Sequence, residues 1–217
     1  MEPFNWKLSA EKVFSASALI PVIVIRDLNQ ALPLAEALLK GGICIMEVTL
    51  RTEIALEAIH LLSQEMKTMV IGAGTVLNDL QLQQVLDAGA AFALSPGATP
   101  SLLSAGRETS IPLIPGISSV SEVMLGMEMG YRHFKFFPAG AMGGVAALQS
   151  FYGPLPDAVF CPTGGINSSN CMDYLALPNV QCVGGSWMVP ETAVQNGDWQ
   201  LITDLCKKAN ALIYDKV

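Results

Sequence analysis

The sequence predicts a (β/α)8 TIM barrel, in which residues 1–217 form a single domain with a short N-terminal helix. Three observations support this fold class. Eight strand-like segments alternate with helical patterns at a spacing of roughly 20 to 25 residues. These segments are continuous apolar runs, which are typical of parallel strands covered by helices on both faces. A chain of 217 residues that is 51% hydrophobic and 14% charged is also long enough to bury one large core.

The first β-α unit shows the pattern on which the other assignments rest. Residues 9–17 are predicted to form the leading helix, and the β-branched run 19–25 is predicted to be a buried parallel strand. A helix is expected over 29–40. Pro33 lies near its first turn, where a missing N–H is tolerated, and Gly41 ends it.

The same alternation continues to the eighth strand. Thr99 followed by Pro100, and Ser119 with Glu122 three residues later, are typical helix starts. The remaining strands are predicted over 43–49, 69–74, 92–95, 111–115, 131–138, 158–163 and 180–184, and the remaining helices over 53–65, 79–88, from 99, 119–130, 144–151 and 168–177. An open doubly wound sheet is the alternative, but the count of eight and the lack of a G-x-G-x-x-G motif after the first strand favour the barrel.

Charge and hydropathy exclude several classes of partner. A formal net charge of −7 argues against nucleic-acid binding, which depends on cationic residues that neutralise phosphates, although a local anion site stays open. The longest apolar run, 18–25, is too short to cross a membrane, and residues 1–14 lack the features of a leader peptide. We therefore expect a cytoplasmic protein with no membrane partner.

The cysteine and histidine inventory gives no indication of a metal site. The five cysteines are an odd number and contain no C-x-x-C pair, so buried free thiols in a reducing compartment are expected. The histidines, His60 and His133, lie far apart in the sequence and have no clustered partners. We expect no bound metal.

Lys135 is the candidate nucleophile. Alternation along residues 131–138 places His133, Lys135 and Phe137 on one face of the strand. An ammonium group among so many apolar side chains is partly desolvated, which favours the nucleophilic free amine and hence a Schiff base. The alternative is a lysine that extends from an ordinary strand to water.

The end of the second predicted strand supplies an acid and a cation. Barrel enzymes carry their chemistry at the carboxyl ends of the strands. Alternation places Glu47, Thr49 and Arg51 on one face at such an end. Glu47 can move protons, and the planar guanidinium of Arg51 suits a carboxylate and would favour the free amine of a neighbouring lysine. A purely structural Glu47–Arg51 ion pair is the alternative.

Two glycine clusters predict a phosphate site. They follow the seventh and eighth strands, where barrels commonly bind phosphate through backbone N–H groups. The alternative is that they only form tight turns. The residues concerned are Gly164, Gly165, Gly184, Gly185 and Ser186.

Seven motifs in this order strongly resemble the KDPG/KHG aldolase family. The resemblance covers roughly residues 18 to 190. The motifs are Glu47-Val48-Thr49-Leu50-Arg51-Thr52, Gly72-Ala73-Gly74-Thr75-Val76, Ser95-Pro96-Gly97, Ile114-Pro115-Gly116, Phe134-Lys135-Phe136-Phe137-Pro138, Pro162-Thr163-Gly164-Gly165-Ile166 and Gly184-Gly185-Ser186.

The resemblance implies a class I aldolase without cofactor or metal. Such enzymes act on keto-acid and sugar-phosphate substrates: they cleave 2-dehydro-3-deoxy-6-phosphogluconate to pyruvate and glyceraldehyde 3-phosphate, and often 4-hydroxy-2-oxoglutarate to pyruvate and glyoxylate. The resemblance also implies a homotrimer. Residue by residue, it makes Lys135 the Schiff-base lysine and Glu47 the general acid/base. It makes Arg51, Thr75 and Thr163 ligands of the pyruvate half, Phe137 and Pro96 walls of the same pocket, and Gly164, Gly165, Gly184, Gly185 and Ser186 the phosphate ligands.

One segment of the sequence departs from the family pattern, and two other functions are compatible with the same residues. Residues 139–142, which follow the lysine strand, are less polar than the family pattern leads us to expect, and this concerns the preference for the aldehyde half. The alternative functions are a phosphate-binding isomerase or epimerase that uses Glu47 and Lys135 only for proton transfer, and a non-catalytic sugar-phosphate binding module.

Overall fold

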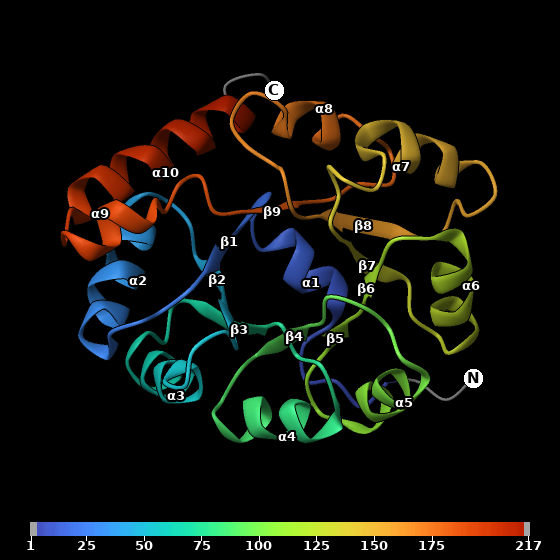
Figure 1. The fold of residues 1–217 in the computed structure, drawn as a ribbon, viewed down its shortest axis with the longest axis horizontal. Helices are drawn as coiled ribbons and strands as arrows, with labels where there is room; N and C mark the ends of the chain where they lie inside the picture. The colour runs from blue at the N-terminus through green and yellow to red at the C-terminus, as the bar shows by residue number, and fades with distance from the viewer. Residues whose placement is uncertain (1–3, 215–217) are drawn as a thin grey trace.

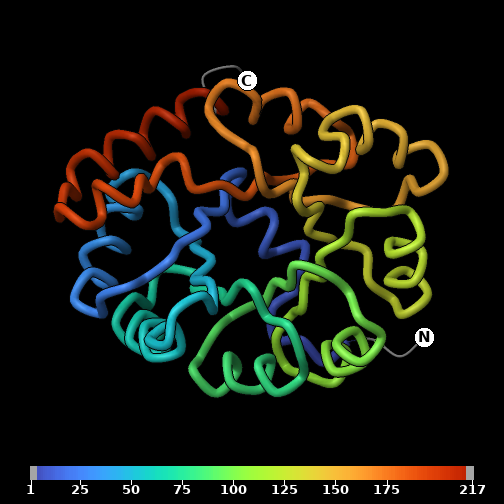
Figure 2. Tube along the Cα trace, in the orientation of Figure 1, coloured from blue at the N-terminus to red at the C-terminus, as the bar shows by residue number. Residues whose placement is uncertain are grey.

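Parallel strands form two sheets in the computed structural model, which describes residues 4–214 (Figures 1 and 2). The larger sheet has the order β5-β4-β3-β2-β1-β9 and the smaller one the order β6-β7-β8. Every pairing within them is parallel. The strands are β1 (Leu19–Ile23), β2 (Ile45–Thr49), β3 (Val70–Gly74), β4 (Phe92–Leu94), β5 (Leu113–Ile114), β6 (Gly116–Ile117), β7 (His133–Phe136), β8 (Val159–Pro162) and β9 (Val183–Gly185).

Helices surround the curled strands on the outside, and one short helix lies within the outline of the strands in this view (Figure 1). The inner helix is α1. This arrangement confirms an α/β fold with a curled parallel sheet and a short N-terminal helix. The helices are α1 (Ala10–Ser15), η1 (Leu28–Gln30), α2 (Ala31–Lys40), α3 (Ala55–Glu65), α4 (Asp79–Asp87), α5 (Pro100–Glu108), α6 (Val120–Glu128), α7 (Gly144–Tyr152), α8 (Cys171–Leu175), α9 (Glu191–Gln195) and α10 (Trp199–Tyr214).

Pro115, the last residue of the strand predicted over 111–115, lies between two short strands. Because proline has no N–H to donate, β5 ends before it, and β6, which follows it and was not predicted, belongs to the smaller sheet. The ladder nevertheless continues past the interruption, since the backbone N–H of Lys135 donates to the carbonyl of Pro115 at 2.9 Å. On the other side, isolated parallel bridges join Phe160 to Val180 and Thr163 to Gly184.

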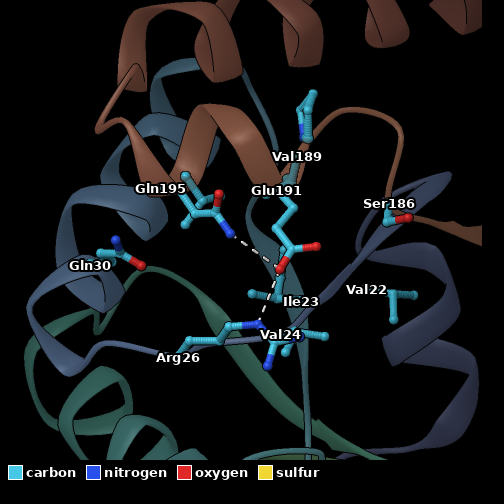
Figure 3. A pocket seen from close by; sticks show the side chains of 11 residues that line it. Val22, Ile23, Val24, Arg26, Gln30, Ser186, Val189, Glu191 and Gln195 are labelled. Atoms are coloured by element: carbon cyan, nitrogen blue, oxygen red, sulfur yellow. Dashed lines mark hydrogen bonds and ion pairs between the residues drawn. The ribbon is translucent and has the colours of Figure 1, made fainter.

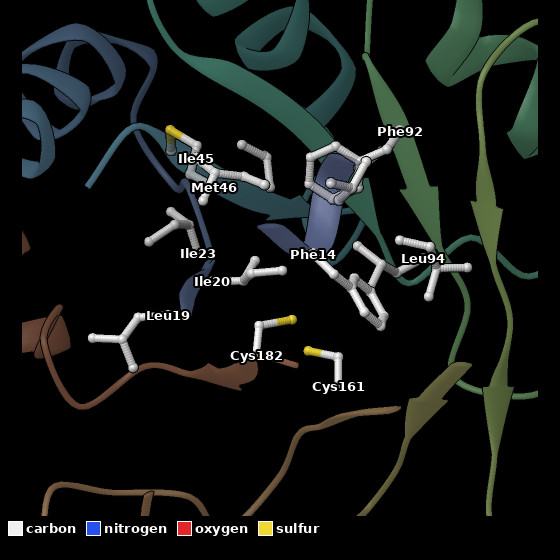
Figure 4. Close-up of a cluster of buried hydrophobic side chains, with 14 of the residues drawn as sticks. Phe14, Leu19, Ile20, Ile23, Ile45, Met46, Phe92, Leu94, Cys161 and Cys182 are labelled. Atoms are coloured by element: carbon white, nitrogen blue, oxygen red, sulfur yellow. The ribbon is translucent and has the colours of Figure 1, made fainter. Parts of the chain in front are cut away.

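One part of the core lies between α1 and the strands, and the rest is formed by buried side chains of the outer helices and the strands. Phe14 of α1 is 1% exposed and packs edge-on against the ring of His133, with 5.2 Å between centroids. Figure 4 shows Phe14 near Leu94, with the side chains of Cys161 and Cys182 below Ile20. All five cysteines are free, as predicted, and only Cys44 is partly exposed rather than buried.

The predicted helix starts are confirmed. The side chain of Thr99 caps α5, and Ser119 and Glu122 form a reciprocal capping box at α6. No helix within residues 4–214 is both long and apolar enough to cross a membrane. The prediction that the first residues carry no leader also concerns residues 1–3, which lie outside the described residues.

The two C-terminal helices, α9 and α10, were not predicted from the sequence. Helix α10 buries Ile202, Cys206 and Ala209, a helical spacing that was available as a signal. It packs on α2: the hydroxyl of Thr203 donates to the carbonyl of Ala37 at 3.0 Å. Asp198, whose carboxylate accepts from the N–H of Leu201 at 3.1 Å, marked its start.

Candidate active site

Lys135 and Glu47 form a buried ion pair between β7 and β2. The Lys135 Nζ donates to the Glu47 Oε1 at 2.9 Å, and the two side chains are 6% and 1% exposed. A lysine that reaches water is therefore excluded. A buried ion pair carries a large desolvation cost, so its presence at the carboxyl end of two strands indicates a chemical role rather than a contribution to stability.

Gly74 on β3 makes room for the Glu47 carboxylate. Gly72 and Gly74 are the register partners of Glu47 and Thr49. A Cβ built on Gly74 would overlap the Glu47 carboxylate, with the carboxyl carbon only 2.6 Å away. The hydroxyl of Thr49 donates to the carbonyl of Ile23 at 2.9 Å and is buried, so it ties β2 to β1.

Arg51 lies outside the buried pair. The strand ends at Thr49 and the chain turns, so the strict alternation that placed Glu47 and Arg51 side by side does not continue. The Arg51 side chain is exposed, and Glu47 pairs with Lys135 instead. The alternative of a buried, structural Glu47–Arg51 pair is therefore wrong, and the guanidinium is available to an anion from solvent.

Thr75 has a strained backbone at the end of β3. Its φ of +62° lies in the left-handed region, which β-branched residues rarely adopt. Strained positions of this kind cluster at functional sites. The residue is half-buried directly after Gly74, which adjoins the Glu47 carboxylate.

Phe137 and Pro96 flank the lysine. The Lys135 Nζ lies 5.4 Å from the centroid of the Phe137 ring, a distance at which the π face stabilises a positive charge. Gly116, the register partner of Lys135, has no space for a Cβ against the backbone of Ser95 and Pro96. The Ser95 hydroxyl accepts from the N–H of Gly116 at 3.1 Å, which fixes this contact.

The glycine clusters lie beside Thr163. The Thr163 side chain is buried, and its backbone bridges to Gly184, where a Cβ would overlap the Thr163 hydroxyl. Gly164 and Gly165 have φ values of +95° and +80°. Within residues 4–214, their two amides have no protein acceptor. Such free amides at the end of a strand suit an anion.

Ser186 lines a surface hollow that was not predicted from the sequence (Figure 3). The hollow also contains Arg26, Glu191 and Gln195. Arg26 could have been noticed, since it follows the first strand. Glu191 could not, because α9 was not predicted.

The loop of residues 139–143, at the carboxyl end of the strand that carries Lys135, is largely exposed. Ala139 is buried, whereas residues 140–143 are exposed and Met142 is 42% exposed. The N–H of Gly140 donates to the carbonyl of Gly164 at 2.9 Å, which joins this loop to the first glycine cluster. Within residues 4–214, no group of three or more His, Cys, Asp or Glu side chains is placed to hold a metal ion.

Comparisons with known proteins agree with this geometry. A family model described as KDPG and KHG aldolase matches residues 10–205. The 2-dehydro-3-deoxy-phosphogluconate aldolase of Pseudoalteromonas atlantica is 56% identical, covering 95% of this chain and 96% of that protein. The KHG/KDPG aldolase of Escherichia coli K12 is 54% identical, covering 94% and 96%.

A solved structure is similar over nearly the whole chain. It is the KDPG aldolase of Legionella pneumophila, with pyruvate captured at low pH as a covalent carbinolamine intermediate. The two structures superpose with a TM-score of 0.93 at 57% sequence identity, covering 94% of this chain and 99% of that one.

Proposed function

This chain belongs to the KDPG and KHG aldolase family, and on that premise we propose that it is a class I aldolase that cleaves 2-dehydro-3-deoxy-6-phosphogluconate to pyruvate and glyceraldehyde 3-phosphate. It also cleaves 4-hydroxy-2-oxoglutarate to pyruvate and glyoxylate. The observation that carries this proposal is the buried contact of 2.9 Å between Lys135 and Glu47.

The pair accounts for each step of the reaction. The Lys135 amine, having passed a proton to Glu47, attacks the C2 ketone. The carbinolamine hydroxyl then takes that proton back from Glu47 and leaves as water, which gives a cationic imine and restores the Glu47 carboxylate. Glu47 then takes the proton of the C4 hydroxyl, the C3–C4 bond breaks, and its electrons move to the imine nitrogen. The aldehyde leaves, the resulting enamine takes a proton back at C3, and water releases pyruvate.

The substrate ligands are part of the same proposal. Arg51, Thr75 and Thr163 bind the carboxylate end of the pyruvate half, which the exposed guanidinium of Arg51 favours. Phe137 and Pro96 form the walls beside the imine. The amides of the two glycine clusters bind the substrate phosphate; the residues concerned are Gly164, Gly165, Gly184, Gly185 and Ser186.

The two alternative functions do not require all the features of this site, in particular an amine placed for imine formation. A non-catalytic binding module has no use for a buried amine beside a carboxylate, which is costly to bury. An isomerase or epimerase would use the pair for proton transfer only and would form no imine.

The proposal also covers the closure of the barrel, the compartment and the oligomeric state of the protein. The strands form one closed (β/α)8 barrel and one domain; the bond from Lys135 to Pro115 and the bridge from Thr163 to Gly184 support closure. The protein is a cytoplasmic homotrimer, with no nucleic-acid or membrane partner. Light scattering should therefore give a mass about three times that of the chain.

Borohydride trapping tests the chemistry. Reduction in the presence of pyruvate should add a stable pyruvate adduct to Lys135, which peptide mass spectrometry would locate. Lys135→Ala should lose the adduct and nearly all cleavage activity. An adduct on another residue, or near-normal cleavage by Lys135→Ala, would overturn the proposal.

A further inference from the structure

The hollow beside the second glycine cluster contains charged and polar side chains to which the proposed mechanism gives no role. It lies between the end of β1, the turn after β9 and helix α9 (Figure 3). Arg26, Gln30, Glu191 and Gln195 line it, together with Ser186.

The strand register places this hollow at the mouth that holds the lysine. Val22 is the register partner of Glu47, so the two side chains project to the same face of the sheet. Val24 follows on that face, one step closer to the carboxyl end. On β9, Gly184 faces Thr163, and Ser186 is the next residue on the same side. Val24 and Ser186 both line the hollow, which therefore lies at the carboxyl ends of β1 and β9, on the face of the sheet to which Glu47 projects.

Arg26 has donors to spare. Its Nε donates to the Glu191 Oε1 at 3.1 Å, and this is its only side-chain hydrogen bond within residues 4–214. The four N–H groups on its terminal nitrogens remain for another acceptor. The same Glu191 oxygen accepts from the Gln195 Nε2 at 3.4 Å, one turn along α9. This second hydrogen bond helps to fix the position of the carboxylate that binds Arg26.

A phosphate monoester at this place needs a full positive charge. The chain has a net charge of −7, and backbone amides supply only partial charges. We propose that Arg26 is a specificity-determining residue that binds the terminal phosphate of the six-carbon substrate, with Glu191 as the residue that positions its guanidinium. The planar fork of a guanidinium suits a phosphate better than the point charge of a lysine does. This inference rests on the proposed function.

The ion pair itself has little structural value, which makes a clean experiment possible. Arg26 and Glu191 are 62% and 64% exposed, and pairs so exposed contribute little to stability. A matched control exists in Lys40 and Glu36, another exposed pair at 3.6 Å on α2. Arg26→Gln and Lys40→Gln remove the same charge, but only the first removes it from the mouth.

The test compares two substrates that differ by one group, 2-dehydro-3-deoxy-6-phosphogluconate and 2-dehydro-3-deoxygluconate. Arg26→Gln should lower kcat/KM for the phosphorylated acid by about tenfold to a hundredfold, and by far less for the unphosphorylated one. Arg26→Lys should recover part of this loss. Lys40→Gln should change neither value. Borohydride trapping of pyruvate, which has no phosphate, verifies that the Arg26 variants are folded.

Glu191→Gln tests whether phosphate binding needs only the Arg26 cation or the whole Arg26–Glu191 ion pair. The amide oxygen still accepts from the Nε of Arg26 while a charge that repels phosphate is removed, so kcat/KM for the phosphorylated acid should not fall. A loss as large as that of Arg26→Gln would overturn the assignment, as would equal losses by Arg26→Gln on both substrates, or none. If the unmodified protein cleaves neither acid and traps no pyruvate, the proposed function fails instead.

Discussion

At the scale of single residues, Thr75 combines backbone strain with a proposed ligand role. A left-handed conformation costs a β-branched residue about 1 to 2 kcal/mol, whereas glycine adopts it freely but loses about 0.5 to 1 kcal/mol of chain entropy. The Thr75 φ of +62° therefore stores free energy that a glycine at this position would not store.

We expect Thr75→Gly to separate stability from activity. The free energy of unfolding should stay the same or rise by up to about 1 kcal/mol, because the strain is relieved. kcat/KM should fall about tenfold or more, because the hydroxyl that binds the pyruvate half is lost. Denaturant unfolding and steady-state kinetics measure the two quantities. A variant that is less stable yet fully active would show that Thr75 is not a ligand.

Gly74 is the residue that leaves space for Glu47, the proposed general acid/base. A Cβ at this position would force the Glu47 carboxylate away from Lys135. Gly74→Ala should therefore lower kcat about tenfold to a thousandfold, since proton transfer depends on hydrogen-bond distance. Gly153→Ala is the control, because a Cβ there meets no atom within 4 Å. Equal activities of the two variants would mean that the Glu47 position does not matter for the reaction.

At the scale of elements, helix α1 and strand β7 meet at His133, a half-buried histidine that packs against Phe14. Burial lowers the pKa of His133 from its usual 6.5, and the nearby Glu11 carboxylate offsets part of this effect. The folded protein therefore holds His133 neutral at pH values where the unfolded chain is already protonated. The stabilisation is complete above pH 6.5 and is lost as the pH falls from 6.5 toward the lowered pKa of the folded state.

His133→Phe should remove this part of the pH dependence. Phenylalanine keeps an aromatic contact with Phe14 but has no proton to gain. Between about pH 7.5 and about pH 5.5, the free energy of unfolding should fall more steeply for the unmodified protein than for the variant. Chemical denaturation at a series of pH values measures both. Parallel curves would show that protonation of His133 is not linked to unfolding.

The strand predicted over 111–115 and the end of β2 show why local sequence patterns predict strands better than they predict how strands pair. The apolar run 111–115 predicted a strand, but Pro115 has no donor, so the ladder passes from β5 to β6. The second strand was correctly predicted to end at Thr49, but its alternation was extended past that end to Arg51. The direction of a side chain beyond the end of a strand depends on the turn that follows and on neighbouring elements, and these are not local properties.

At the scale of the whole molecule, the proposed function divides the mouth between the chemistry and the phosphate. Lys135 and Glu47 lie between β7 and β2, whereas the first glycine cluster follows β8 and the second is at the end of β9. Binding energy from a phosphate remote from the reacting carbons can raise kcat/KM. We therefore expect the phosphorylated six-carbon acid to be preferred over 4-hydroxy-2-oxoglutarate.

Ser186→Asp tests this division. A carboxylate at the second cluster should repel the phosphate and lower kcat/KM for the phosphorylated acid about tenfold to several-hundredfold, with a much smaller effect on 4-hydroxy-2-oxoglutarate. Gly184→Val is a poorer test, because its side chain would collide with Thr163 and so disturb both substrates. If Ser186→Asp weakens both reactions equally, the phosphate lies elsewhere.

The sequence by itself determined the alternation of strands and helices, the lysine strand and the motifs that indicate an aldolase. These follow from local periodicity and from residue order, which the chain carries without folding. The tertiary structure decided that Glu47 pairs with Lys135 rather than with Arg51, that Thr75 is strained, and that Arg26 meets Glu191 beside Ser186. Arg26 and Glu191 are separated by 165 residues, and only the parallel packing of β9 on β1 brings their ends together.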